Sequence, residues 1–210
     1  MGSPGRFAMV FSPVIIARIA GLLLVVLCLQ PVAGEPPREP AAVVEGFHEE
    51  LLALMQGDFS YAERERRMRG AVQERFDMPT IGRITVGGTW RKLEKDQRTA
   101  LLEALTDLTA TTYADRFDSY NEHRFVTLDT SDAGGGRSRV RTELQRVNRD
   151  SVQLDYFLLD GLIFNVVADG VSDLSLRRAE YAAILRDGGF AALLSEIRSK
   201  IEQYRDSGEP

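Results

Sequence analysis

Apolar residues in the first half of the chain recur at the spacing of amphipathic helices. From residue 43 onward they repeat at intervals of three and four, and the same period runs through a highly charged segment and a long later one. Pro79 and Gly87-Gly88 bound a short piece between them, because proline disfavours a helical residue before it and glycine ends helices. The pattern predicts helices over residues 43–56, 61–76, 80–86 and 95–117.

The second half changes to the period of two that β-strands show. Val140, Thr142 and Leu144 alternate with charged and amide residues, which predicts a strand with one wet face. Asp160-Gly161 separates two apolar runs and predicts a two-residue hairpin turn. Helical spacing returns after Gly170 and is interrupted at Gly188-Gly189. The predicted strands cover residues 125–129, 139–145, 152–159 and 162–168, with a turn-rich loop at 132–136, and the last helices cover 174–186 and 190–204.

This order predicts an α+β fold, with helices packed on a twisted antiparallel sheet of about four strands. The strand at 162–168 is apolar on both faces, and the one before it becomes so at Phe157 and Leu159. An antiparallel sheet often leaves one face in water, so these strands need cover on both sides. A second helix layer or a bound ligand would supply it. We therefore expect the fold to enclose an apolar pocket.

The N-terminus has the pattern of an export signal. Residues 19–29 are all apolar or glycine, a run too short to span a bilayer but as long as the apolar core of a signal peptide. Small residues follow in Val32-Ala33-Gly34, which is the pattern that precedes a cleavage site, here after Gly34. We predict a signal peptide over 1–34, a linker over 35–42 and a single domain over 43–206. An uncleaved membrane anchor, which would use the apolar stretch from Val14 onward, is the alternative.

Composition narrows the function further. The chain is 44% hydrophobic and 27% charged, with a net charge of −5, so a dedicated nucleic-acid surface is not expected. Cys28, the only cysteine, falls inside the predicted signal peptide, which leaves no thiolate for a metal or a disulfide. His48 and His123 are too few and too far apart to make a zinc site, and we expect both on the solvated surface. No cofactor and no metal are predicted.

Motifs that mark catalysis are missing from the sequence. It contains no glycine-rich phosphate loop and no nucleophile elbow. Asp155 and Asp169 are the candidates for a buried general base, as in pocketed enzymes of the steroid-isomerase type. However, Asp155 shares a strand face with Gln153 and Asp169 lies at a strand end. We therefore do not expect an enzyme, and keep a steroid-isomerase-like enzyme acting on an apolar small molecule as the alternative.

Several short segments, in their order and spacing, resemble the MlaC family, the periplasmic substrate-binding proteins of lipid ABC transporters, also called toluene-tolerance auxiliary proteins. The resemblance covers residues 43–204. The landmarks are Phe76-Asp77-Met78-Pro79, Val86-Gly87-Gly88-Thr89-Trp90, Tyr113-Ala114, Val166-Val167-Ala168-Asp169-Gly170-Val171-Ser172 and Tyr181-Ala182-Ala183-Ile184-Leu185-Arg186-Asp187-Gly188-Gly189-Phe190. The segment from Asp173 to Tyr181 is similar to the hopanoid-associated HpnM branch of that family.

The resemblance implies a periplasmic carrier that shuttles a membrane lipid, either a hopanoid or a phospholipid. Its implied partners are the lipid and a membrane-bound transporter or lipid-donor and acceptor complex, with no nucleic acid, and a monomer is expected. The HpnM-like segment tips the preference slightly toward hopanoid. For Arg177 and Arg178, in that segment, two placements are open: one of them near a cavity mouth and the other in solvent, or both on a solvated helix face, which is more typical of such a pair.

Large apolar side chains on the helices and on the strand faces are the candidates to line the pocket. The predicted lipid-binding residues are Phe76, Ile81, Ile84, Leu105, Leu108, Tyr113, Phe117, Leu154, Tyr156, Leu158, Phe164, Val166, Tyr181 and Leu185. Trp90 is expected instead to fill the joint between the short helix and the long one.

Overall fold

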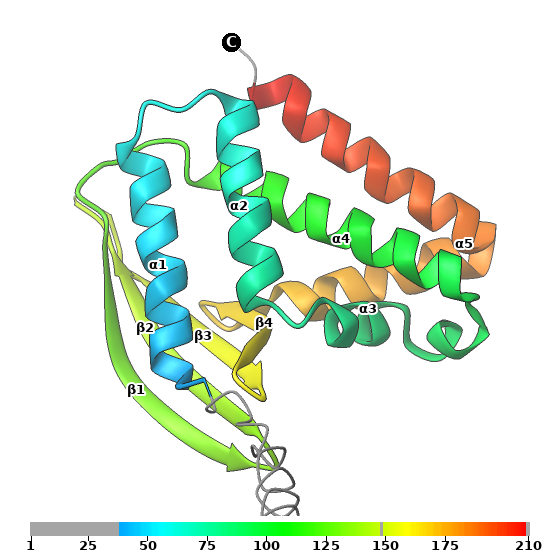
Figure 1. The fold of residues 1–210 in the computed structure, drawn as a ribbon, viewed down its shortest axis with the longest axis horizontal. Coiled ribbons are helices and arrows are strands. Elements are labelled where there is room, and N and C mark those ends of the chain that lie inside the picture. Colours follow the sequence, from blue (N-terminus) through cyan, green and yellow to red (C-terminus); the bar gives the residue numbers. More distant parts are fainter. Residues whose placement is uncertain (1–37, 148, 209–210) are drawn as a thin grey trace, which may run out of the picture. The chain divides into compact units, whose positions relative to one another are not determined.

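A computed structural model describes residues 38–147 and 149–208 of the 210-residue chain (Figure 1). The predicted signal peptide and its cleavage site lie outside the described residues. The helices are α1 (Pro40–Gln56), α2 (Tyr61–Arg75), α3 (Met78–Val86), the 3-10 helix η2 (Gly87–Lys92), α4 (Lys95–Arg116) and α5 (Asp173–Gly208). The strands are β1 (Arg124–Gly134), β2 (Arg137–Gln145), β3 (Val152–Leu159), β4 (Leu162–Ala168) and β5 (Val171–Ser172).

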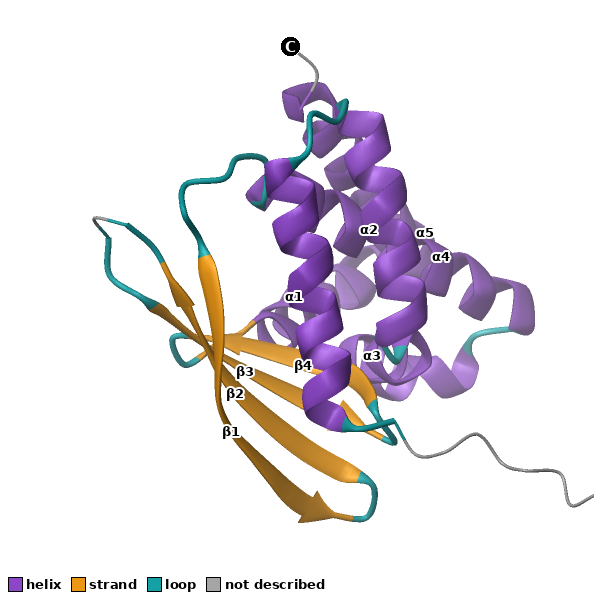
Figure 2. Ribbon diagram, turned by 60° about the vertical axis from the view of Figure 1, so that its left-hand side comes forward, coloured by secondary structure: helices purple, strands orange, loops and turns teal. Residues whose placement is uncertain are grey.

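The sheet is an antiparallel meander in the order β1-β2-β3-β4-β5. The helices lie on one of its faces (Figure 2), so the predicted α+β class is confirmed. The sheet has five strands where about four were predicted, because two residues after Gly170 pair with the end of β4. Two residues are too few to show an alternating pattern in a sequence.

The alternation predicted for the strands sets the inner, helix-facing side of the sheet. Val140 pairs with Tyr156 and Thr142 pairs with Leu154, and all four side chains are buried. The residues that alternate with these along β2 and β3 form the outer face of the sheet, where the Phe157 side chain is half-buried. The apolar outer positions of β3 and β4 are thus only partly covered by the described part of the chain, and no second helix layer lies over them.

Helix α1 and strand β1 both extend beyond their predicted limits. Helix α1 begins at Pro40, inside the expected linker, because the Glu39 side chain caps it by accepting a hydrogen bond from the Ala42 amide at 2.9 Å. Strand β1 continues to Gly134, although a loop was predicted from Asp132. Pairing with β2 holds this polar segment extended, so tertiary context overrides its low strand propensity.

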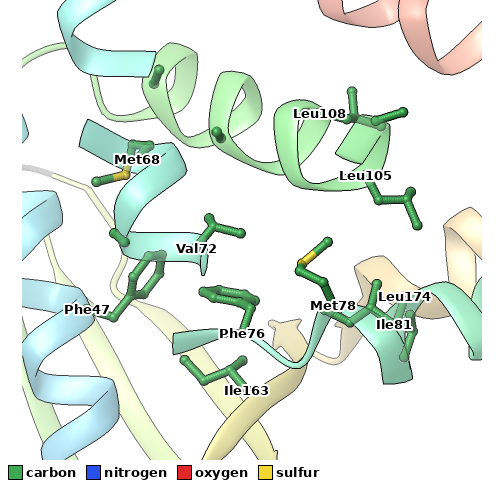
Figure 3. Packing of buried hydrophobic residues seen from close by; sticks show 14 of the residues in the cluster. Phe47, Met68, Val72, Phe76, Met78, Ile81, Leu105, Leu108, Ile163 and Leu174 are labelled. Carbon is green, nitrogen blue, oxygen red and sulfur yellow. The ribbon is translucent and has the colours of Figure 1, made fainter. Parts of the chain in front are cut away.

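The joint between α2 and α3 ties the helices to the sheet. The amide of Asp77 donates a hydrogen bond to the Ile163 carbonyl at 2.8 Å, so the chain makes a parallel bridge to β4 at Phe76. The Phe76 ring points between Phe47 on α1 and Ile163 on β4 (Figure 3). Asp77 then caps α3 by accepting from the Thr80 amide at 2.9 Å. The predicted break before Pro79 is therefore a docking point as well as a helix boundary.

Glycine and aspartate take the backbone conformations that the turns require. Asp160 and Gly161 have φ of 50° and 76°, which gives the hairpin turn predicted between β3 and β4. Gly189 has a φ of 69° and breaks α5 at the predicted position. Among the described residues, no helix combines the length and apolar character needed to cross a membrane.

Trp90 lies between α3 and α4, as expected. A Cβ placed on Gly82 of α3 would stand 3.3 Å from the indole ring, and the Arg98 guanidinium of α4 lies 5.4 Å from the ring centre. Arg98 also donates a hydrogen bond to the Trp90 carbonyl at 3.2 Å. The indole is absent from the walls of the four best-formed hollows among the described residues, and its contacts are those of a packing residue.

Replacing Trp90 with alanine should therefore lower stability without emptying the binding site. Because the indole is half-buried, we expect a loss of about 2 kcal/mol, or about 4–8 °C in Tm. Thermal unfolding followed by circular dichroism measures it, with Trp90→Phe as the control that keeps most of the apolar contact. An unchanged Tm for Trp90→Ala would contradict this role.

Candidate functional site: adjoining cavities at the end of α4

Three hollows meet around the last turns of α4. The large cavity, of about 430 Å³, lies between that end of α4 and the inner face of β2 to β4. The small cavity, of about 90 Å³, lies between α4, α3 and β4, and the α4–α5 cavity, of about 220 Å³, lies on the other side of α4. The large cavity is within the size range of small-molecule sites, about 300–1,000 Å³.

Shared lining residues show that the three cavities adjoin. Tyr113 and Val166 line both the large and the small cavity. Asp173 and Arg177 line both the small and the α4–α5 cavity, and Arg116 lines all three. The three hollows are therefore neighbours that share side chains of α4, β4 and α5 in their walls.

Threonines of α4 that face the cavities have their hydroxyls bonded within the helix. Thr109 donates to the Leu105 carbonyl at 2.8 Å, and Thr112 donates to the Leu108 carbonyl at 2.6 Å. This bonding leaves the methyl groups to contact the hollow. The wall is thus largely apolar although its sequence contains hydroxyls.

A connected set of rings, here called the aromatic cluster, fills the space beside the cavities. It joins α1, the α2–α3 joint, α4, β1 and β3, and its members are Phe47, His48, Phe76, Tyr113, Phe117, Phe125 and Tyr156. Phe47 meets Phe76 and Tyr113 edge-on at 5.1 and 5.0 Å between ring centres. Such contacts add stability beyond the area they bury.

His48 is buried, which corrects the expectation of a solvated histidine. It is 4% exposed, stacks on Phe125 at 4.0 Å, and its Nε2 lies 3.0 Å from the Tyr156 hydroxyl. Burial lowers the pKa of His48 to about 3, so the ring is neutral near pH 7. The burial of His48 could have been predicted from the sequence, because His48 is four residues after Val44 and three before Leu51, on the apolar stripe of α1. His123 is half-exposed, at the edge of the large cavity.

The polar edge of the small cavity gathers charge around Tyr113. Arg177 donates to the Asp173 carboxylate at 2.8 Å, and its side chain is only 13% exposed, whereas Arg178 is exposed. Arg177 thus lies at a cavity rather than on a solvated helix face, the placement that its sequence favoured, whereas Arg178 lies in solvent. Arg116 is exposed where the three hollows adjoin, and its side chain makes no hydrogen bond or ion pair with any described residue. Burial raises the pKa of Tyr113, Asp173 adds to the rise, and Arg177 and Arg116 oppose it.

Most of the predicted lipid-binding residues come together at these hollows. Five of them line the small cavity, three others the large cavity alone, and two the α4–α5 cavity: Phe76, Ile81, Tyr113, Phe164 and Val166; Phe117, Leu154 and Tyr156; Leu108 and Tyr181. Four line none of them: Ile84, Leu105, Leu158 and Leu185. Leu105 and Leu158 are fully buried in the packed core, and Ile84 and Leu185 pack against it.

Sequence reasoning did not select the polar lining residues. Arg116, Asn165 and Asp173 line the small cavity, and Arg146 and Arg149 line the large one. Apart from Asn165, which lies within β4, these residues are at element ends or in loops, where period and spacing carry no information about which side chains converge. A charged residue there is indistinguishable in sequence from one in solvent.

The two candidate general bases lie away from the cavities. Asp155 is on the outer face of β3, where Gln153 donates to it at 3.0 Å and Arg141 lies 3.6 Å away. The Asp169 carboxylate accepts a hydrogen bond from the backbone N–H of Gln153 at 2.8 Å. Neither lines any of the hollows. Within residues 38–147 and 149–208, no three acidic, histidine or cysteine side chains gather as a metal site.

An α+β domain with adjoining apolar cavities under a one-sided sheet is the architecture of a protein that holds a hydrophobic ligand. The chain belongs to the MlaC family, whose model, described as "MlaC protein", matches residues 46–199. It is therefore a lipid-binding carrier protein.

Among solved structures, the fold is similar to that of a protein from Ralstonia solanacearum described as a phospholipid-binding protein in complex with a phospholipid. The TM-score is 0.68 at 18% sequence identity, and the match covers 80% of this chain and 99% of the other. At this identity the likeness establishes the fold. No curated protein matches the chain.

The buried His48 predicts a stability that falls in mild acid. Its folded pKa of about 3 lies below the ordinary 6.5, so the unfolded chain binds the extra proton between those values. The free energy of unfolding is therefore unaffected by this group above about pH 6.5. It decreases as the pH falls below that value, by about 2 kcal/mol at pH 5. Urea unfolding at pH 7 and pH 5 measures the difference.

Because carboxylates also titrate in this range, the comparison is with His48→Gln, which has no titrating ring. We expect this variant to lose less stability between pH 7 and pH 5 than the wild type does. The same pH-dependent loss in both proteins would show that His48 is not its source.

Proposed function

We propose that the protein is a periplasmic carrier that shuttles a membrane lipid between membranes or membrane complexes, with the lipid's apolar part in the adjoining cavities. The observation that carries the proposal is the meeting of the large, small and α4–α5 cavities around Tyr113 and Arg116. The printed description of the Ralstonia solanacearum protein, which has a similar fold, supports a lipid as ligand.

The energy of transfer explains why such a carrier needs partners. Burying a 16-carbon chain at about 0.8 kcal/mol per CH₂ gives on the order of 13 kcal/mol before costs are subtracted. A lipid held this way does not leave quickly into water. Loading and release therefore call for a membrane-bound transporter or a donor and acceptor complex, and the carrier itself acts as a monomer.

Export follows from the N-terminal pattern, with residues 1–34 removed as a signal peptide before the domain folds in the periplasm. The mass of the intact protein, purified from that compartment, tests this step. A chain that begins at Glu35 supports removal after Gly34, and a chain that retains residues 19–29 in the membrane fraction supports the alternative of an anchor.

The charge at the cavity junction favours a lipid with an anionic headgroup. Arg116 has no acceptor among the described residues, and Arg177 next to it is paired with Asp173. An unpaired guanidinium is matched by a phosphate, which accepts charge-assisted hydrogen bonds from it. A phospholipid is therefore our first candidate, which reverses the slight preference that the HpnM-like segment gave to hopanoid.

A hopanoid remains the second candidate cargo because rings line the space. Phe76, Phe164 and Tyr113 face the small cavity, and Phe117 and Tyr156 face the large one. A rigid, flat and nearly apolar molecule would pack well against such side chains. The steroid-isomerase alternative has no comparable support, because Asp155 and Asp169 lie outside the cavities.

The experiment that tests the proposal is identification of co-purified lipid. The full chain is expressed, incubated with mixed membranes that contain phospholipid and hopanoid, and re-isolated, and an organic extract is analysed by mass spectrometry. Recovery of phospholipid supports the first candidate and recovery of hopanoid the second. Absence of any lipid would count against the carrier function.

Val166 lies in the wall between the large and small cavities, so a large side chain there should displace lipid. We expect Val166→Trp to lower the lipid recovered per protein to roughly half or less, because overpacking the wall leaves no room for the ligand. Val167→Trp is the matched control, since Val167 is half-exposed on the opposite face of the same strand. Equal recovery from the two variants would contradict the placement.

Arg116 should affect only lipids that carry a negative charge. We expect Arg116→Ala to lower phospholipid recovery about tenfold, the size of one lost hydrogen bond to a charged group, and to leave hopanoid recovery unchanged. Arg178→Ala, at an exposed arginine that lines none of the cavities, is the control. Loss of both lipids in Arg116→Ala would point to a structural role instead.

A further inference from the structure

Two loops form the rim of the large cavity. One joins α4 to β1 and the other joins β2 to β3, and both lie at the same end of the sheet (Figures 1 and 2). Arg116, Arg146, Val147 and Arg149 line the cavity from this rim. Tyr120 is not itself in the lining, but it lies in sequence between the lining residues Ser119 and Asn121, and its ring is 6.3 Å from that of His123, which also lines the cavity. We call Arg116, Tyr120, Arg146, Val147 and Arg149 the mouth rim.

The mouth rim exposes large apolar side chains. Tyr120 is 44% exposed and Val147 is 38% exposed, which places both among the five large apolar side chains that are exposed in the described part of the chain. Leu128, at 52%, is on β1 and lines no cavity. Exposed apolar residues gathered at the mouth of a cavity are typical of a surface that contacts another hydrophobic body.

The mouth rim is also basic on an acidic chain. Its three arginines face one acidic lining residue, Asp118, while the chain as a whole has a net charge of −5. Glu122 and Asp150 lie in the same two loops, and the Asp150 carbonyl accepts two hydrogen bonds from Arg146, at 3.1 and 2.6 Å. Desolvation, Arg146 and Arg149 together lower the pKa of His123, which agrees with a positive local potential.

We infer that the mouth rim docks the carrier on the surface of an anionic bilayer, with Tyr120 and Val147 entering the interface and the three arginines contacting lipid phosphates. This inference rests on the proposed carrier function. With the mouth against the bilayer, beside the membrane-bound partner, a lipid tail moves between membrane and cavity over a path that keeps it out of water. An aromatic side chain beside arginines is the composition that suits a membrane–water interface.

Vesicle co-sedimentation tests the docking. The processed protein, purified from the periplasm, is mixed with vesicles of phosphatidylcholine alone or with phosphatidylglycerol added, at low and high salt. The test variants are Val147→Asp and the double variant Arg146→Glu/Arg149→Glu. Their matched controls are Leu128→Asp, which places the same charge on an exposed apolar site of β1, and the double variant Arg91→Glu/Lys92→Glu, which reverses two charges at exposed positions of η2 away from the three cavities.

The wild type and both controls should bind the anionic vesicles more tightly than neutral ones, and more weakly at high salt. The double variant should bind at least about tenfold more weakly, since each arginine near an anionic surface contributes about 1 kcal/mol. Val147→Asp should also bind more weakly, on both kinds of vesicle.

Test variants that sediment like the wild type would overturn the inference. Binding to native membranes but not to protein-free vesicles would overturn it in favour of a protein partner. The lipid content of the wild type is measured in parallel. If the wild type carries lipid but does not bind vesicles, the docking alone is refuted. If the wild type never carries lipid, the carrier function itself is refuted.

Discussion

Contact among the rings of the aromatic cluster is the interaction on which the rest of the structure depends. The sheet is covered by helices on one face, so its attachment to them rests on few elements. Phe76 anchors the α2–α3 joint on β4, and Phe47 and Tyr113 extend that anchor to α1 and α4. Phe125 and His48 continue it to the far edge of the sheet. These rings attach the helices to the sheet, and their size sets the distance between the two layers.

This spacing accounts for the cavities. Helix α4 meets the sheet through Tyr113 and Phe117 rather than along its whole length, which leaves hollows on both sides of Tyr113. Close packing would be expected to fill such space in a core that has no ligand. The hydrogen bond between His48 and Tyr156 fixes a ring in the wall of the large cavity without placing a charge beside it. The core thus stabilises the fold and shapes the ligand site with the same side chains.

The sequence predicted what depends on period and turn chemistry, including the helices, the hairpin at Asp160-Gly161 and the break at Gly189. It also predicted most of the apolar lining, because large apolar residues on inner faces must meet in one place. It missed what depends on tertiary context. The histidine at position 48 is polar by type but buried by its place on α1, and Arg116 acquires its position from three elements that converge on it.

The threonines of α4 have a consequence for selectivity. Since Thr109 and Thr112 satisfy their hydroxyls on the helix's own carbonyls, the wall offers a ligand shape but little directional bonding. Chains that differ in length or unsaturation would then be discriminated only by fit, which for one methylene is a small effect, about 1–3 kcal/mol. Sorting of cargo would fall to the charged junction at Arg116. Such a carrier would accept whichever acyl chains the membrane contains at a given time, but would still select lipids with one class of polar headgroup.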